Sequence, residues 1–211
     1  MATIRDRMEK RNGWVWPKID TQCFEFSFQE EPEIPAWVMA FVPGRRTLVQ
    51  AGGNCGQYVM EYCQHFERVI TFEPEAANHF ALVANVDADN CYAFRAALGA
   101  LAGGSALYDA GKNTGAHFVA ANGPIPTLPL DALGLEDVDL IHLDIEGYEA
   151  FALIGARETI GRCKPWIALE DRRGHASRYQ MPESSLSDLL QSFGYDRHAE
   201  YKHEVIWKPR P

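Results

Sequence analysis

The segment 48–57 constrains the fold of this 211-residue chain more than any other. Two apolar residues, Leu48 and Val49, lead into a turn with three glycines, and a helical pattern follows at once. Beyond the turn, the apolar side chains have the i, i+3, i+4, i+7 spacing of a helix with one buried face: Val59, Tyr62, Cys63 and Phe66. Glycines let a backbone approach a ligand closely, and a helix N-terminus offers unpaired N–H groups. The segment therefore predicts a site for a small polar ligand.

A second strand-like run ends in an acid at a set distance from this turn. Residues 69–72 are strand-like, and Glu73 follows them, 21 residues after Gly52. In a βαβ unit, an acid at the tip of the second strand lies where ribose hydroxyls bind. Turn and acid together predict a nucleoside-binding site, although the G-G-x-x-G spacing differs from the G-x-G-x-x-G of dinucleotide-binding turns.

The bulk properties of the chain indicate one soluble globular domain. It is 46% hydrophobic and 23% charged. The net charge of −9 disfavours a nucleic-acid partner, and no apolar run reaches the ~18 residues of a membrane span. The charged N-terminus lacks the apolar core of a signal peptide, so we expect a cytoplasmic protein. Five scattered cysteines without a C-x-x-C pair favour reduced thiols over a zinc site or disulfides.

Strands and helices alternate from residue 46 onward, which divides the chain into two parts. Residues 1–45 are predicted to be an N-terminal appendage, and residues 46–211 the ligand-binding domain. In the appendage we expect short strands at 14–17 and 23–28 and a short helix over 36–41. In the domain we expect strands at 47–51, 68–72, 91–95, 139–144 and 166–170, and helices at 56–66, 76–86, 149–160 and 186–193.

This alternation predicts an α/β fold in which helices cover both faces of a mostly parallel sheet. Two last strands after residue 194 are expected to form an antiparallel hairpin, which brings the sheet to seven strands. Residues 99–130 are less regular, and we expect a short hairpin and a loop over the strand ends there.

Residues 139–149 form the second dense motif, a buried strand that ends in acidic residues. Ligands of open α/β sheets bind at the carboxyl ends of the strands, so Asp144 and Glu146 are aimed at the same crevice as Gly52 and Glu73. At a strand tip, Asp144 can contact a cofactor, accept a substrate hydrogen bond or ligate a cation.

Three neighbouring residues have less specific roles. His142 lies two residues before Asp144 on the same side of the strand, where it is either a base or a satisfied core residue. Glu170 ends the following strand and is expected to face the same crevice. Glu149 is expected only to favour the first turn of the next helix.

At this point the residues resemble a family. The blocks 49–56, 72–74 and 143–149 look like those of FkbM-type S-adenosylmethionine-dependent methyltransferases, as do the shorter stretches 113–115, 130–133, 155–160 and 164–170. The resemblance implies a Rossmann-like class I methyltransferase fold with a C-terminal antiparallel hairpin. It also implies S-adenosylmethionine as donor, S-adenosylhomocysteine as product and, commonly, O-methylation of a sugar or sugar-like hydroxyl.

Carried over by position, the resemblance assigns roles to particular residues. It places eight residues at the cofactor: Gln50, Gly52, Gly53, Asn54, Gly56, Gln57, Glu73 and Asp144. The family usually has an acid where Gln50 stands and often a lysine where His142 stands, so weaker cofactor binding is one expectation. In the catalytic hypothesis Asp144 or His142 removes the acceptor proton, and Glu170 orients the acceptor.

Several alternatives stay open on the sequence alone. Asp144, Glu146 and Glu170 are able to seat Mg²⁺, although an interpretation without a metal is favoured. An inactive homologue that serves as an interaction module and a nicotinamide-dependent oxidoreductase are the competing functions. The appendage and the loops 103–129 and 171–183 are expected to bind the acceptor, a small polar molecule or a glycan. Their polar residues suit an anionic sugar: His117, Arg172, Arg173, His175, Arg178 and Tyr179.

Overall fold

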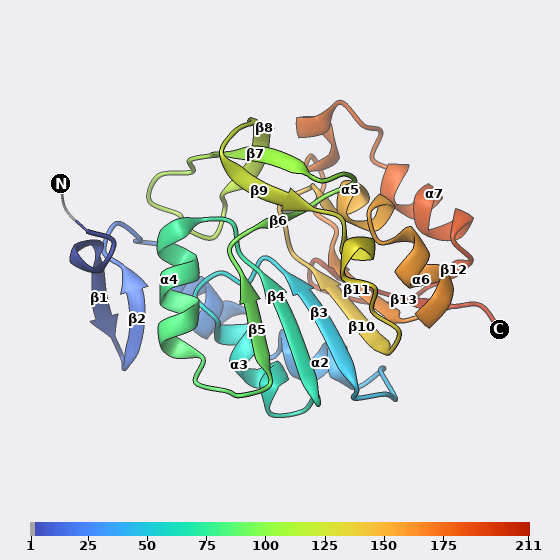
Figure 1. Cartoon of the computed structure of the whole chain (residues 1–211), viewed down its shortest axis with the longest axis horizontal. Helices are drawn as coiled ribbons and strands as arrows, with labels where there is room; N and C mark the ends of the chain where they lie inside the picture. Colours follow the sequence, from blue (N-terminus) through green and yellow to red (C-terminus); the bar gives the residue numbers. More distant parts are fainter. Residues whose placement is uncertain (1–2) are drawn as a thin grey trace.

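The computed structural model describes residues 3–211, and its main element is a seven-stranded sheet (Figure 1). The strand order is β12-β13-β11-β10-β3-β4-β5. Five strands run parallel: β3 (Thr47–Ala51), β4 (Arg68–Phe72), β5 (Cys91–Phe94), β10 (Val138–Leu143) and β11 (Trp166–Glu170). The hairpin of β12 (Tyr195–Tyr201) and β13 (Glu204–Pro209) pairs antiparallel to β11. This mixed sheet confirms the predicted fold class.

Alternate residues of each strand face opposite layers of helices, because successive side chains of a strand point to opposite faces. On β3, Val49 packs in one core, and the helices of that core are α5 (Glu149–Ile154), α6 (Arg157–Cys163) and α7 (Ser185–Ser192). Leu48 packs in the other core, whose helices are α2 (Ile34–Met39), α3 (Gln57–Cys63) and α4 (Ala76–Asn85). The strands β3, β4, β10 and β11 are therefore buried on both faces, whereas Tyr92 and Phe94 lie on an exposed face of the edge strand β5.

One predicted helix, 149–160, is two helices in the structure, α5 and α6. The chain interrupts the helix at Gly155, which lies so close to another segment that a Cβ there would be 2.0 Å from the carbonyl oxygen of Gly99. A distant carboxylate, that of Asp131, then caps α6 by accepting the backbone N–H of Thr159. The other helix ends lie within three residues of their predicted positions.

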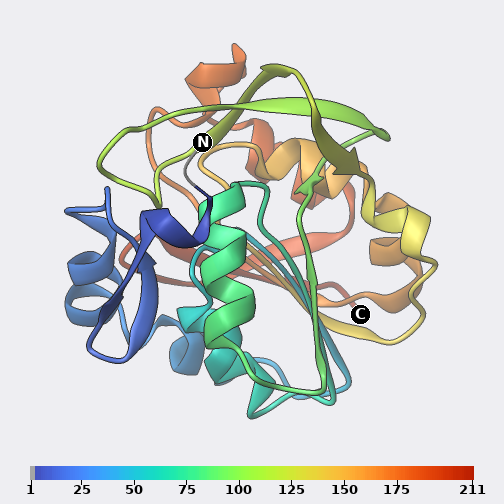
Figure 2. The same cartoon turned by 60° about the vertical axis from the view of Figure 1, so that its left-hand side comes forward.

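The N-terminal segment contains the predicted strand at 14–17, but the strand predicted at 23–28 is wrong. β1 (Met8–Arg11) and β2 (Trp14–Pro17) form a hairpin beside α4 (Figure 2). The chain then turns into the helix α1 (Cys23–Glu25), which continues as a π-helical turn (Phe26–Glu30). The buried carboxylate of Asp20 caps it by accepting the N–H groups of Cys23 and Phe24. The rings of Phe24 and Phe28 pack together in a tilted arrangement, with centroids 4.7 Å apart, and the alternating pattern did not reveal this contact.

A second, smaller sheet crosses the carboxyl ends of the parallel strands (Figures 1 and 2). Its order is β6-β9-β7-β8, and its strands are β6 (Ala97–Leu98), β7 (Gly103–Tyr108), β8 (Phe118–Asn122) and β9 (Ile125–Leu128). The region expected to hold a hairpin and a loop is thus a four-stranded cover. Three 3-10 turns complete the described elements: Arg5–Arg7, Leu130–Leu133 and Ala176–Tyr179. Among residues 3–211, no helix combines the length and the apolar character that crossing a membrane requires.

Candidate active site

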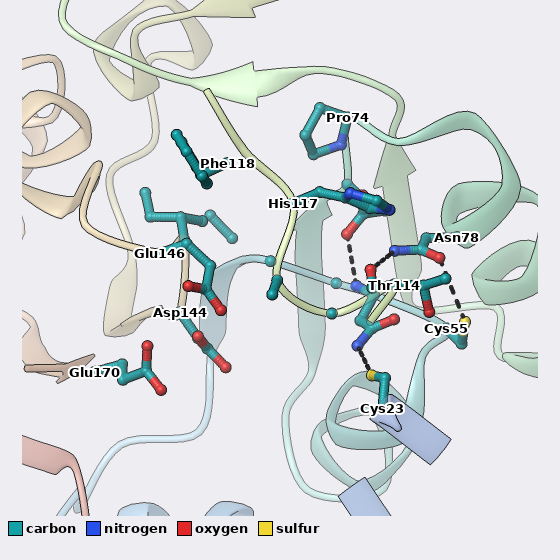
Figure 3. A pocket seen from close by; sticks show the side chains of 18 of the residues that line it. Cys23, Cys55, Pro74, Asn78, Thr114, His117, Phe118, Asp144, Glu146 and Glu170 are labelled. Carbon is teal, nitrogen blue, oxygen red and sulfur yellow. Dashed lines mark hydrogen bonds between the residues drawn. The ribbon is translucent and has the colours of Figure 1, made fainter. Parts of the chain in front are cut away.

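A cavity of about 270 Å³ lies at the carboxyl ends of β3, β4, β10 and β11 (Figure 3). The turn after β3 and the loops after β4 and β10 form its floor. Segments 22–31 and 113–119 contribute the remaining walls. Six of the predicted cofactor residues line it: Gly52, Gly53, Asn54, Gln57, Glu73 and Asp144. Glu170 lines it as well.

The turn after β3 is possible only with glycine at two positions. Gly52 has φ +87°, and a Cβ there would lie 1.9 Å from the backbone oxygen of Asp144, so the turn presses directly on the end of β10. Gly56 has φ +93° and starts α3, although it does not itself line the cavity. The backbone N–H groups of Gly52 and Gly53 donate to the carbonyl of Phe72. The turn is therefore tied to both neighbouring strands.

Glu73 connects the glycine turn to the start of α4. Its Oε2 accepts the backbone N–H of Asn54 at 2.8 Å, and its Oε1 accepts that of Glu75 at 2.7 Å. Burial raises the pKa of the Glu73 carboxyl to about 7, and the two hydrogen bonds oppose this rise only in part. Glu73 lines the cavity where the predicted ribose hydroxyls would be, with lone pairs left on each oxygen.

Carboxyl groups gather at the other end of the cavity. Figure 3 shows Asp144, Glu146 and Glu170 together, across from Asn78 and Thr114. Burial, followed by the facing carboxylates of Glu170 and its neighbours, raises the pKa of Asp144 well above its ordinary value. Burial likewise raises the pKa of Glu170 to about 8, although Arg172 donates to its Oε1. A carboxyl such as that of Glu170, with a pKa of about 8, can take up and release a proton near neutral pH.

Gln50 does not line the cavity. Its side chain is buried beneath the turn, where Oε1 accepts a hydrogen bond from the hydroxyl of Thr71 and Nε2 donates to the carbonyl of Gly52 at 2.8 Å. The structure therefore gives Gln50 the task of holding the turn from below.

His142 also lies outside the cavity lining. It is fully buried under α3, with Nδ1 2.6 Å from the hydroxyl of Tyr62 and Nε2 3.3 Å from Oε2 of Glu204. Of the two roles open to it, the structure favours the satisfied core residue. The alternation of β10 gave the correct face of the strand, but α3 covers that face at this depth.

Cys23 and Asn78 lie on the cavity wall, although neither residue was assigned a role there from the sequence. The amide of Asn54 donates to the thiol of Cys23 at 3.0 Å, and the amide of Asn78 donates to the carbonyl of Thr114 at 2.7 Å. Tyr148 lies on the wall as well. These residues come from segments that are far apart in the chain and meet only in the fold. Of the six predicted acceptor-site residues, His117 and Arg172 lie on the cavity wall. The other four do not line it: Arg173, His175, Arg178 and Tyr179.

Glu149 does more than favour a helix start. Its Oε1 accepts the N–H groups of Ile145 and Gly147, at 3.0 and 3.2 Å, and so fixes the loop that carries Asp144. Burial raises the pKa of this carboxyl to about 7.

We expect Glu149→Gln to flatten part of the pH dependence of stability. Because the pKa is raised in the folded state, the contribution of Glu149 is complete below its ordinary pKa and is lost as the pH rises through about 7. The variant keeps an acceptor oxygen but carries no charge. Its free energy of unfolding should therefore exceed that of the wild type by on the order of 1–3 kcal/mol at about pH 8. Denaturant unfolding across the pH range measures this difference.

Glu158→Gln, at an exposed position of α6, is the matched control and should keep the wild-type pH profile. A Glu149→Gln profile parallel to that of the wild type would contradict the assignment.

Solved structures with a similar fold identify the fold class of the chain. An FkbM methyltransferase from Methylobacillus flagellatus KT is similar at a TM-score of 0.52 and 20% identity, over 88% of this chain and 52% of that one. Magnesium protoporphyrin IX methyltransferase (ChlM) from Synechocystis PCC 6803, solved with bound SAM, is similar at 0.53 and 10% identity, over 90% and 83% of the two chains. These likenesses show the class I methyltransferase fold, and the chain spans about half the length of the Methylobacillus protein.

The family follows from a sequence comparison. The model of the methyltransferase FkbM domain matches residues 50–202, and the chain belongs to this family. This match confirms the resemblance seen in the three motif blocks. No curated protein matches the chain.

Proposed function

We propose that this protein transfers a methyl group from S-adenosylmethionine to a hydroxyl of a sugar or another small polar acceptor. The observation that carries the proposal is one cavity with two chemically different ends. The glycine turn and Glu73 form one end, and the carboxyls of Asp144 and Glu170 form the other.

The residues at the first end fit the cofactor. Gly52 and Gly53 line the cavity without a side chain of their own, so their backbone atoms can contact a ligand directly. The Oδ1 atom of Asn54 is buried in the cavity wall and has no hydrogen-bond partner among the described residues, so it can accept from a ligand N–H or O–H group. Glu73 would hold the ribose hydroxyls. Bound S-adenosylmethionine would supply an electrophilic methyl group.

The chain's own residues would prepare the acceptor. A hydroxyl must lose its proton as it is methylated, and a positioned base contributes typically 10²–10⁴-fold to such a step. Asp144 is the candidate base and Glu170 the candidate orienting group, because both carboxyls face the cavity. The pKa of Asp144 is raised in the free protein. A positively charged ligand in the cavity would lower this pKa and so populate the ionised form, which can accept the proton of the hydroxyl.

Calorimetric titration with S-adenosylmethionine, S-adenosylhomocysteine and NAD tests the proposal. We expect binding of the first two and none of NAD. Turnover with sugar acceptors then separates an enzyme from an inactive homologue that only binds the cofactor. Binding of NAD alone would replace the proposal with an oxidoreductase.

In the same titration, Glu73→Ala should weaken cofactor binding at least ~30-fold, because charge-assisted hydrogen bonds contribute roughly 1.5–3 kcal/mol each. Glu61→Ala is the control: the side chain of this residue on α3 is 42% exposed, and its ion pair among residues 3–211 is with His65. Unchanged affinity in Glu73→Ala would remove Glu73 from the cofactor site.

A further inference from the structure

Two carboxylates and an imidazole converge beside the acidic end of the cavity. Glu146 follows β10, Glu170 ends β11, and His175 belongs to the loop after β11. One potential ligand atom from each lies within 4.8 Å of those from the other two. Glu146 and Glu170 line the main cavity, whereas His175 lines a smaller cavity on the far side of Glu170.

The distances within this cluster are too long for hydrogen bonds between charged groups, which measure about 2.7–2.9 Å. His175 Nε2 is 3.5 Å from Glu146 Oε2, and His175 Nδ1 is 3.7 Å from Glu170 Oε2. Atoms that each bind one ion at about 2.0–2.2 Å are separated by roughly 3–4 Å. An imidazole binds one ion through one nitrogen, so either Nε2, next to Glu146, or Nδ1, next to Glu170, would be the ligand. One ligand atom from each of the three residues lies within 4.8 Å of the other two, which is the spacing that carries the argument.

Two buried atoms in the cluster lack a partner. Glu170 is only 7% exposed, and its Oε2 has no hydrogen bond among the described residues. The same holds for Nδ1 of His175. Native proteins rarely leave such atoms unsatisfied, and an unpaired buried carboxylate oxygen calls for a cation or a donor.

The surrounding contacts hold the three side chains in place without filling the space between them. The loop of His175 lies directly on Gly147, where a Cβ would come within 2.7 Å of the carbonyl oxygen of His175. Arg178 donates to the backbone oxygen of Glu146 and to its Oε2, at 2.6 and 2.9 Å. Arg172 donates to the other oxygen of Glu170, Oε1, and leaves Oε2 free. A carboxylate oxygen has two lone pairs, so Glu146 Oε2 can accept from Arg178 and still bind an ion.

We propose that Glu146, Glu170 and His175 bind a divalent cation that accepts both oxygen and nitrogen ligands. Carboxylates alone suit Mg²⁺ or Ca²⁺, whereas an imidazole in the set shifts the preference toward Mn²⁺ or Zn²⁺. This set differs from the Asp144, Glu146 and Glu170 set considered on the sequence, because His175 is visible only in the fold. The site rests on its own geometry and does not depend on methyl transfer.

Calorimetric titration of the full-length, chelator-treated protein with MnCl₂ tests the site, with MgCl₂ as the comparison. We expect one Mn²⁺ per chain with a Kd below ~100 µM and at least ~10-fold weaker Mg²⁺ binding. His175→Ala and Glu146→Gln should each weaken Mn²⁺ binding at least ~10-fold. His65→Ala, which removes an exposed histidine beside Glu61, should leave it unchanged.

Absence of Mn²⁺ binding up to ~1 mM would overturn the proposal, as would wild-type affinity in both His175→Ala and Glu146→Gln. No cofactor is present in this titration. Binding of Mn²⁺ without binding of S-adenosylmethionine would therefore support the cation site and contradict the proposed function. Binding of S-adenosylmethionine without binding of Mn²⁺ would support the proposed function and contradict the cation site.

Discussion

Gly52→Ala is expected to abolish cofactor binding and to lower the free energy of unfolding by at least ~3 kcal/mol. The left-handed backbone of Gly52 alone costs another residue about 1–2 kcal/mol. The added methyl group would also lie 1.9 Å from the backbone oxygen of Asp144, so β10 or the turn has to move. That movement shifts the glycine turn relative to Asp144, and both line the cavity. Denaturant unfolding and titration with S-adenosylmethionine measure the two effects.

Gly161→Ala is the matched control. Gly161 lies within α6, has no atom within 4 Å of an added Cβ and no positive φ. Alanine there should stabilise the protein by about 0.5–1 kcal/mol and leave cofactor binding unchanged. If Gly52→Ala bound the cofactor with wild-type affinity, the close packing of the turn against β10 would not be required for cofactor binding.

The positions of the glycine turn and Glu73 on one cavity were predictable because their determinants are local in sequence. The strand, the turn at Gly52 and the helix are consecutive, and the spacing to Glu73 is that of one βαβ unit. Each of these features leaves a mark in a short stretch of sequence. The fold class followed from the same alternation of strands and helices.

The sequence did not show in this way whether a side chain of a strand lies in the cavity or is buried beneath a helix. The strand alternation placed His142 on the same side of β10 as Asp144. It could not show that α3 covers His142, because helix placement depends on packing between distant segments. The hydroxyl of Tyr62 on α3 forms a hydrogen bond with Nδ1 of His142. That ring nitrogen would be free if His142 lay in the cavity.

Contacts between distant segments account for the other differences. The cap that Asp131 provides for α6 spans 28 residues, and the thiol of Cys23 meets Asn54 across 31 residues. His175 reaches Glu146 only because the loop after β11 rests on Gly147. No hydrophobic periodicity or residue spacing in the sequence predicts these contacts.

Asp144→Asn should lower turnover at least ~100-fold while the affinity for S-adenosylmethionine changes little. Asparagine has the shape of aspartate but cannot take the acceptor proton. Its neutral side chain resembles the protonated carboxyl that burial and the facing carboxylates favour in the free protein, so the cavity should keep its form. Steady-state turnover with a competent sugar acceptor, together with calorimetric titration of the cofactor, separates the two effects.

Asp196→Asn is the control, since this exposed aspartate of β12 pairs only with Arg210 at the surface, and both measurements should match the wild type. The two candidate bases give opposite results for Asp144→Asn. If His142 removed the proton, the variant would retain most of its turnover, because His142 contacts Tyr62 and Glu204 through its ring nitrogens and not Asp144. Near-normal turnover would therefore return the catalytic role to the buried histidine and require a path for the proton beneath α3. A large loss at unchanged cofactor affinity would leave Asp144 as the base, with a pKa that burial raises first and the facing carboxyl of Glu170 second.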